Sequence, residues 1–150
     1  MTLLTALVRR LPSFAQAQAR SAWERNIALP LTTLEDANVV ILGYGGIGRE
    51  IARRLKAFGS RVTAVARSEW TDEFADRIVA SSKFHEVLAD ADAPVVASSL
   101  TPETKGLVDA SALAALRRGA ILVNIARGGV VDTMAVVEAQ LGALRGLGVD

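Results

Sequence analysis

The chain has no cysteine, which excludes disulfide bonds, thiolate metal sites and a cysteine nucleophile. A single histidine, His85, is too little for a histidine-rich metal cluster, so we expect no metal site. Aromatic residues make up only 5% of the composition and the arginines are scattered along the chain, which argues against a nucleic-acid-binding surface. No apolar run reaches the ~18 residues that a membrane-spanning helix requires. We therefore expect a cytoplasmic protein that binds neither nucleic acid nor membrane.

The remaining composition is typical of a globular domain. Hydrophobic residues make up 51% and charged residues 22% of the 150 residues, with a net charge of +1. A chain of this length fits one domain and buries ~68–70% of its unfolded surface, so it can fold without covalent cross-links. The first apolar stretch follows no basic segment and runs directly into Arg9 and Arg10, an order that is wrong for an export signal.

The N-terminal segment predicts a helix. Its apolar residues recur at helical spacing: Leu3, Leu4, Leu7, Val8, Leu11 and Phe14. We expect Pro12 to kink or break this helix, because proline lacks the backbone N–H and clashes with the preceding turn. The helical pattern resumes over Ala15–Trp23, and Asn26–Leu31 is expected to be a connector. These patterns divide the chain into a helix with its connector, residues 1–33, and a domain, residues 34–150.

From Ala37 onward, short apolar runs alternate with helical patterns. The expected strands are Val39–Leu42, Val62–Ala66, a weak Ile78–Ala80, Pro94–Ala97, Ala120–Asn124 and Leu147–Val149. The expected helices are Arg49–Phe58 with Ile51, Leu55 and Phe58 on one face and Gly59 as its cap, Asp72–Arg77, Glu86–Ala91, Asp109–Arg117 and Thr133–Leu144. This alternation predicts an α/β fold, a Rossmann-type doubly wound parallel sheet, with an extra N-terminal helix.

A glycine-rich turn follows the first expected strand and opens a helix. Its residues fit the pattern G-x-G-x-x-G: Gly43, Tyr44, Gly45, Gly46, Ile47 and Gly48. Gly43 would allow the tight turn, Gly45 would let a pyrophosphate approach the backbone, and Gly48 would let helix and strand pack closely. The phosphates would then rest on free N–H groups at the helix N-terminus. The alternative is a glycine-rich turn without a ligand, but the strand before it and the helix after it favour a dinucleotide site.

The end of the second expected strand bears on which dinucleotide binds. A site for NAD usually places an acidic residue here to hold the ribose 2′-hydroxyl. This chain has Ala66, followed by Arg67 and Ser68, which could accept a 2′-phosphate instead. We therefore expect a preference for NADP(H), with NAD(H) possible. Arg67 could also be an ordinary solvated residue, and Glu69 could supply the missing carboxylate from a later position.

The segment after the Pro94–Ala97 strand has two interpretations. In open α/β sheets, ligands bind outside the carboxyl ends of the strands, so we expect Ser99, Leu100 and Thr101 to line the cofactor groove. Alternatively Thr101 caps a helix whose first position is Pro102. The two roles are compatible.

Arg127 comes directly after the Ala120–Asn124 strand and is flanked by glycines. A guanidinium is expensive to bury without an anionic partner, so we expect it to face a cleft that receives a carboxylate or phosphate. Asp150 would lie at the same sheet edge, either as a functional residue or only as the end of the final strand. Asp132 is expected to cap the following helix, and His85 is expected on the surface.

These motifs together resemble the NAD(P)-binding domain of the D-isomer-specific 2-hydroxyacid dehydrogenase family, truncated at both ends. The resemblance covers almost the entire chain. It is carried by the glycine turn, by Leu100–Gly106 (L-T-P-E-T-K-G), by Gly119–Asp132 and by the strand within Leu144–Asp150. Ser99 stands where the family usually has proline, and Ala66 replaces its usual acidic residue.

The resemblance implies that Arg127 is the catalytic arginine, which holds the substrate carboxylate and polarises the 2-oxo group. It also implies that Ile125, Ala126, Arg127 and Asp150 contact the cofactor. The family's catalytic histidine and its glutamate lie beyond the aspartate that matches Asp150, so this chain by itself is expected to be inactive. His85 does not match that histidine.

The expected function is that of the cofactor-binding part of an NAD(P)-dependent 2-hydroxyacid dehydrogenase of the glyoxylate or hydroxypyruvate reductase type. Its substrate would be a small 2-hydroxy or 2-oxo acid. The Leu3–Trp23 segment resembles the family's interdomain helix and would form a homodimer interface. The alternative is a non-catalytic nucleotide-binding interaction module, similar to the family's corepressors, or an inactive fragment.

Overall fold

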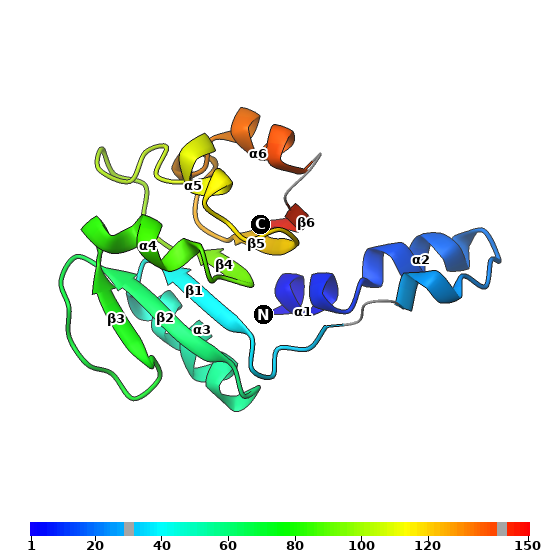
Figure 1. The fold of residues 1–150 in the computed structure, drawn as a ribbon, viewed down its shortest axis with the longest axis horizontal. Coiled ribbons are helices and arrows are strands. Elements are labelled where there is room, and N and C mark those ends of the chain that lie inside the picture. The colour runs from blue at the N-terminus through cyan, green and yellow to red at the C-terminus, as the bar shows by residue number, and fades with distance from the viewer. Residues whose placement is uncertain (29–31, 141–143) are drawn as a thin grey trace.

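A six-stranded parallel sheet forms the centre of the computed structural model, which describes residues 1–28, 32–140 and 144–150 (Figure 1). The strands are β1 (Asn38–Leu42), β2 (Arg61–Ala66), β3 (Arg77–Ala80), β4 (Ala93–Val96), β5 (Ala120–Asn124) and β6 (Leu144–Val149). Their order is β3-β2-β1-β4-β5-β6 and every neighbouring pair is parallel. The chain order reverses between β1 and β4, which places a topological switch point at the centre of the sheet. The predicted Rossmann-type fold is confirmed.

Helices cover both faces of this sheet. They are α1 (Thr2–Val8), α2 (Leu11–Ala19), α3 (Gly46–Ala57), α4 (Phe84–Leu88), α5 (Ala110–Ala114) and α6 (Thr133–Gln140), with short 3-10 turns η1 (Arg25–Ala28), η2 (Ser81–Lys83) and η3 (Gly128–Val130). In β1, Val39 and Ile41 pack with α1 and α3, whereas Val40 and Leu42 pack with α4, α5 and α6. Burial on both faces explains why the strands are continuous apolar runs rather than alternating ones.

The N-terminal helix breaks two residues earlier than predicted. Arg10 has φ 54°, in the left-handed region, so the break lies between α1 and α2 rather than at Pro12. Pro12 instead occupies the first turn of α2, where a missing N–H needs no partner. The predicted helix Ala15–Trp23 ends at Ala19, and η1 begins one residue before the predicted connector and covers its first three residues. The remainder of that connector, residues 29–31, falls outside the described residues.

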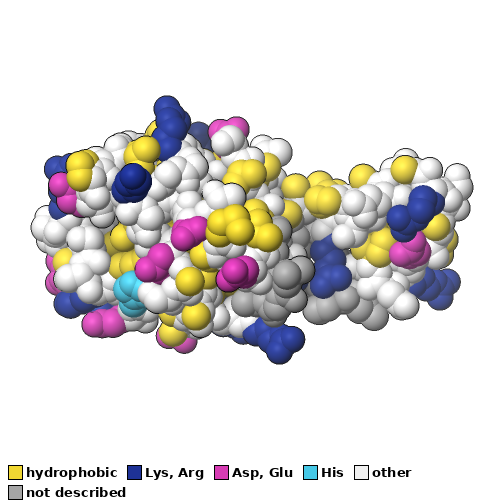
Figure 2. All heavy atoms as spheres, turned by 90° about the horizontal axis from the view of Figure 1, so that it is seen from above, with side chains coloured by type: hydrophobic (Ala, Val, Ile, Leu, Met, Phe, Trp, Pro, Cys, Tyr) yellow, Lys and Arg dark blue, Asp and Glu magenta, His cyan; other side chains and the backbone are white. Residues whose placement is uncertain are grey.

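The segment from α2 to η1 projects from the body of the molecule as an arm, whereas α1 packs against β5 and β6 (Figure 1). We call residues 11–28 the arm. Apolar side chains are exposed along it, as Figure 2 shows at the right of the molecule. Leu11 is 55% exposed, Phe14 37% and Trp23 88%. Exposed apolar residues gathered on one segment are candidates for an interaction surface.

Two further sequence predictions are wrong. Residues 72–77 form no helix: Asp72 and Ala75 make an isolated β-bridge, and β3 already begins at Arg77. The reason is local, because the Asp72 carboxylate accepts a hydrogen bond from the Phe74 amide and so holds the backbone in a turn. Phe58 does not share the buried face of Ile51 and Leu55: it follows α3 and is 51% exposed.

The remaining boundaries differ by a few residues. α5 is shorter than predicted, and Leu144 begins β6 rather than ending a helix. Asp132 caps α6 through its Oδ1, which accepts from the amides of Met134 and Ala135, as predicted. Gly59 ends α3 with φ +76°, also as predicted. In the described part of the chain, no helix is long and apolar enough to cross a membrane.

Candidate functional site

The glycine turn lies between β1 and α3, at the carboxyl end of the strand beside the switch point. Both neighbouring strands hold the end of β1: the Gly43 amide donates to the Val65 carbonyl over 3.1 Å, and the Ala97 amide donates to the Leu42 carbonyl over 2.8 Å. Gly43 has φ +100°, and a Cβ there would lie 2.5 Å from the Cα of Ser98. Since both constraints are backbone constraints, only glycine fits the position.

The other glycines of the turn divide into two kinds. A Cβ at Gly48 would collide with the carbonyl oxygen of Gly43, so this glycine allows the helix to pack against the turn. A Cβ at Gly45 or Gly46 would meet nothing within 4 Å. Packing therefore explains Gly48 but leaves open space beside Gly45 and Gly46, where a ligand can approach the backbone.

The N-terminus of α3 faces this open turn. Gly45 is its N-cap, no side chain caps its first amides, and its first turn carries no acidic residue. The free N–H groups and the positive end of the helix dipole favour an anion at this place. The residues present thus fit the pyrophosphate of a dinucleotide.

The side chain of Tyr44 points away from the open side of the turn. The residue is 9% exposed and its ring lies tilted against Trp70 at a centroid distance of 5.6 Å. Its hydroxyl donates to Oδ1 of Asp72 over 2.9 Å. Burial, and then this hydrogen bond, raise the pKa of Tyr44 above its usual value. A ligand can therefore reach mainly the backbone of Tyr44. The side chain of the nearby Ile47, in contrast, is accessible, since this residue is 63% exposed.

Asp72 is a polar residue of the site that the sequence did not reveal. Its side chain is 6% exposed and accepts from Arg49 Nε over 2.7 Å, from the Tyr44 hydroxyl and from the Phe74 amide, both over 2.9 Å. The Arg49 guanidinium holds the pKa of this carboxyl below its ordinary value and also lies 4.7 Å from the centroid of the Phe74 ring. The only sequence signal was an acidic residue in a segment that we took for a helix.

Arg67 and Ser68 emerge from the end of β2, beside the turn. Both are exposed, and neither side chain makes a hydrogen bond or ion pair among the residues that the structure describes, although Arg67 lies close enough to Glu103 to lower the pKa of that carboxyl. Glu69, the alternative partner for a ribose, forms an ion pair with Lys83 over 2.7 Å. The Glu69 carboxylate is thus engaged with η2.

The segment after β4 forms a turn and not a helix, so Thr101 is not a helix cap. Thr104 fixes the turn: its hydroxyl donates to the Ser99 carbonyl over 2.6 Å and accepts from the Thr101 amide over 2.8 Å. Leu100 is 47% exposed and lies against Gly129, where an added Cβ would come 3.3 Å from its methyl carbons. Ser99, Leu100 and Thr101 thus lie at the same sheet edge as the glycine turn, and Leu100 reaches the Arg127 loop.

The loop that carries Arg127 is fixed by a buried asparagine at the end of β5. Asn124 Oδ1 accepts from the Ala126 amide over 2.9 Å, and its Nδ2 donates to the Arg127 carbonyl over 3.4 Å. Arg127 itself is exposed, and its guanidinium donates only to the Ala126 carbonyl over 3.1 Å. Among the described residues it has no acidic partner, so it is available to an anion. The Asp150 amide donates to the Asn124 carbonyl over 3.1 Å, which brings Asp150 to this edge.

The structure thus gathers the predicted site residues at the carboxyl edges of four strands: the glycine turn after β1, Arg67 and Ser68 after β2, Ser99 to Thr101 after β4, and Ile125 to Arg127 after β5. Asp150 follows β6 at the same edge. His85 does not belong to this group. It is exposed on α4, where its ring meets the edge of Phe84 at 4.9 Å, as the prediction of a surface position requires.

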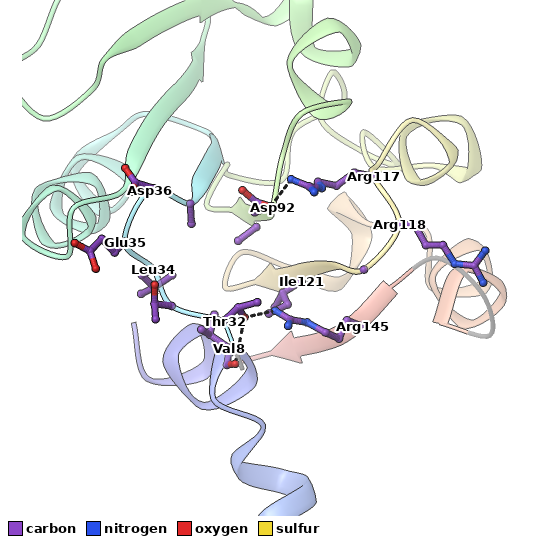
Figure 3. A pocket seen from close by; sticks show the side chains of 14 residues that line it. Val8, Thr32, Leu34, Glu35, Asp36, Asp92, Arg117, Arg118, Ile121 and Arg145 are labelled. Atoms are coloured by element: carbon purple, nitrogen blue, oxygen red, sulfur yellow. Dashed lines mark hydrogen bonds and ion pairs between the residues drawn. The ribbon is translucent and has the colours of Figure 1, made fainter. Parts of the chain in front are cut away.

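A cavity of about 500 Å³ lies at the opposite edge, where β4, β5 and β6 begin (Figure 3). Arg145 Nη2 donates there to Thr32 Oγ1 over 2.7 Å, and Arg117 pairs with Asp92 over 2.6 Å. Because parallel strands present their carboxyl ends to the other side, this cavity is separate from the candidate cofactor site.

Comparison with known proteins agrees with this geometry. A family model described as "D-isomer specific 2-hydroxyacid dehydrogenase, NAD binding domain" matches residues 1–150. The D-3-phosphoglycerate dehydrogenase of Bacillus subtilis is 38% identical over 138 residues, which cover 91% of this chain and 26% of that protein. The glyoxylate reductase of Thermococcus gammatolerans is 36% identical over 156 residues, covering 99% and 47%.

A solved structure is similar over the whole fold. It is a D-isomer specific 2-hydroxyacid dehydrogenase from Xanthobacter autotrophicus Py2 in complex with NADPH and MES, with a TM-score of 0.86 and 31% identity over 99% of this chain and 61% of that one. The chain therefore spans 26%, 47% and 61% of the three proteins compared.

Proposed function

This chain belongs to the D-isomer specific 2-hydroxyacid dehydrogenase family, and from that premise we propose that it is the cofactor-binding part of an oxidoreductase. The reaction is hydride transfer between the nicotinamide ring and C2 of a small 2-hydroxy or 2-oxo acid. One observation carries the proposal: the uncapped N-terminus of α3 opens onto a glycine turn beside the switch point, at the same sheet edge as Arg127, which has no acidic partner among the described residues. Anion sites of this kind bind the pyrophosphate of dinucleotides.

Each predicted residue has a place in this proposal. The amides at the start of α3 hold the pyrophosphate, and the open positions at Gly45 and Gly46 let it approach. Gly43 and Gly48 shape the turn, with Tyr44 and Ile47 between them. Ser99, Leu100 and Thr101 line the groove, and Ile125, Ala126 and Asp150 lie on the nicotinamide side. When bound, the dinucleotide supplies or accepts the hydride.

Arg127 is the catalytic residue that this chain contributes. Its planar guanidinium can form two parallel hydrogen bonds to the substrate carboxylate and can polarise the 2-oxo group. A proton donor is also required, and His85, which is exposed on α4, does not match the histidine that the family uses. We therefore propose that the donor comes from outside these 150 residues and that the chain alone does not turn over glyoxylate or hydroxypyruvate. Residues 1–33 would be the interdomain segment and residues 34–150 the dinucleotide-binding domain.

Two measurements test the function together. Calorimetry of this chain with NADPH and NADH should show binding, and an absorbance assay with glyoxylate or hydroxypyruvate should show turnover only in the longer protein. Absence of binding by either dinucleotide would overturn the proposal. Binding combined with inactivity of the longer protein would favour the alternative, a nucleotide-binding interaction module, which the exposed apolar arm would also serve. A cytoplasmic location and the absence of nucleic-acid binding stay predictions.

We expect NADPH to bind more tightly than NADH. Arg67 and Ser68 are exposed beside the turn, and a charge-assisted hydrogen bond to a 2′-phosphate contributes ~1.5–3 kcal/mol, about a tenfold to hundredfold difference in affinity. Replacing Arg67→Ala should remove most of the difference while leaving NADH affinity unchanged. Titrations of both proteins with both cofactors decide this; tighter NADH binding by the unmodified chain would contradict it.

We propose that the protein is a homodimer through the Leu3–Trp23 segment. A groove on the arm is lined by residues that include Phe14, Ala17, Trp23 and Ile27, and its apolar surface needs a partner. The change Phe14→Glu should convert the dimer to a monomer in sedimentation equilibrium. The matched control is Val137→Glu, at an exposed apolar position on α6 (51% against 37% for Phe14) that lies off the arm. A monomeric unmodified protein, or equal effects of both changes, would refute this interface.

A further inference from the structure

We propose that Asp72 is a positioning residue for the dinucleotide, because its buried carboxylate ties the glycine turn to the segment that leaves β2. The inference rests on the proposed function, since it requires that the turn binds a dinucleotide. It adds that affinity for the adenosine half depends on a residue that needs no contact with it.

The carboxylate joins three separate places in the chain. Tyr44 belongs to the glycine turn, Arg49 follows its last glycine on α3, and Phe74 lies in the connection between β2 and β3. All three donate hydrogen bonds to Asp72, at 2.9, 2.7 and 2.9 Å respectively. The bonds to Tyr44 and Arg49 connect residues 28 and 23 positions apart. Asp72 thus sets the spacing between the two walls of the candidate site.

The hydrogen bonds of Asp72 also restrict the position of the segment that follows β2, residues 67–72. Only Glu69, Trp70 and Thr71 separate Ser68 from Asp72 in the sequence. Glu69 is tethered to Lys83 over 2.7 Å, and the Trp70 ring lies against Tyr44. With both ends of this short segment held, the positions of Arg67 and Ser68 are restricted even though their side chains are exposed.

Charge balance supports the assignment. An ionised carboxylate next to a phosphate-binding turn would repel the ligand if it were alone. Arg49 lies against it at 2.7 Å, and a second contact from Arg49 reaches Glu73 over 3.2 Å. The Asp72–Arg49 pair is therefore neutral, and the net negative charge of the cluster is that of the exposed Glu73.

The chain offers a matched control on the same connection. Asp76 Oδ1 pairs with Lys56 over 2.7 Å, and its Oδ2 accepts from the Val62 amide over 2.7 Å. Asp76 thus ties the β2–β3 connection to the opposite end of α3 and to the start of β2. Its removal should destabilise the fold through the loss of similar contacts, but at a place far from the glycine turn.

The test compares Asp72→Asn with Asp76→Asn by calorimetric titration with NADPH and with adenosine 2′,5′-bisphosphate, beside thermal melting. We expect Asp72→Asn to weaken both ligands by at least about tenfold, the loss that corresponds to one charge-assisted hydrogen bond. Asp76→Asn should lower the melting temperature and change both affinities by less than about twofold. A general loosening of the fold would not separate the two variants in this way.

Tyr44→Phe removes a single hydrogen bond and tests the idea if Asp72→Asn does not fold. It should weaken adenosine 2′,5′-bisphosphate by a smaller factor. Where Asp72→Asn folds, the loss in the double variant should be less than the sum of the two single effects. Unchanged affinity in Tyr44→Phe, or equal losses in the Asp72 and Asp76 variants, would overturn the positioning role. If the unmodified chain binds no dinucleotide, the proposed function itself fails.

Discussion

Replacing Gly43→Ala should unfold or severely destabilise the domain, whereas Gly45→Ala should leave it folded and remove dinucleotide binding. At Gly43 a side chain must adopt φ +100° and place its Cβ 2.5 Å from backbone atoms of Ser98. The left-handed conformation alone costs ~1–2 kcal/mol, and overpacking against atoms that cannot move adds ~1–3 kcal/mol. Together these are a large share of the ~5–15 kcal/mol by which a domain is stable.

Gly45 differs in both respects. Its backbone, with φ −93° and ψ −161°, is one that alanine adopts, and a Cβ there meets no atom within 4 Å. The change should raise the stability by ~0.4–1 kcal/mol because it restricts the unfolded chain. The same methyl group would occupy the open space in which the pyrophosphate approaches. Chemical denaturation and NADPH titration of the two variants separate the effects. A stable Gly43→Ala protein, or unimpaired binding by Gly45→Ala, would show that we have misassigned these roles.

Replacing Arg127→Gln should lower kcat/KM for 2-oxo acid reduction by about 10²–10⁴-fold in the longer protein that carries this domain, because two hydrogen bonds to the substrate carboxylate are lost at ~1.5–3 kcal/mol each. Arg127→Lys keeps the charge but lacks the planar fork, so it should recover only part of the activity. The affinity for NADPH should change little, because we assign the guanidinium to the substrate carboxylate and the backbone of residues 125–127 to the cofactor.

Arg118→Gln is a suitable control for the Arg127 variants. Arg118 lies beside the cavity at the opposite edge of the sheet, so loss of its charge alters the net charge equally but leaves the site intact. Steady-state kinetics with separate variation of cofactor and 2-oxo acid would locate the effect. Retention of kcat/KM within about threefold in Arg127→Gln would exclude a role in holding the substrate.

Much of the architecture could be predicted because local patterns carried it. The run in β1 is apolar at every buried position, and the run in β5 is apolar up to its last residue, Asn124, which is typical of strands covered on both faces. Asp132 and Gly59 were recognisable as helix ends because capping depends on a residue and its immediate neighbours. The short segments were less predictable. Residues 72–77 and 101–104 have too few positions for a periodicity to show. In the first segment a helix was expected, and in the second a helix was one of two interpretations. In both, a single side chain holds the backbone in a turn instead.

The glycine turn and the alternation of strands and helices follow from the amino acids themselves, because backbone freedom, chain reversal and burial are local requirements. No local rule brings Asp72 to Tyr44 and Arg49, or Arg127 to the same edge as Gly45. These contacts and this shared edge depend on the parallel pairing of strands. β1 pairs with β2 and β4, and β5 pairs with β4 and β6. Such pairing joins residues that are far apart in the sequence, so the partners of a side chain emerge only when the sheet has assembled.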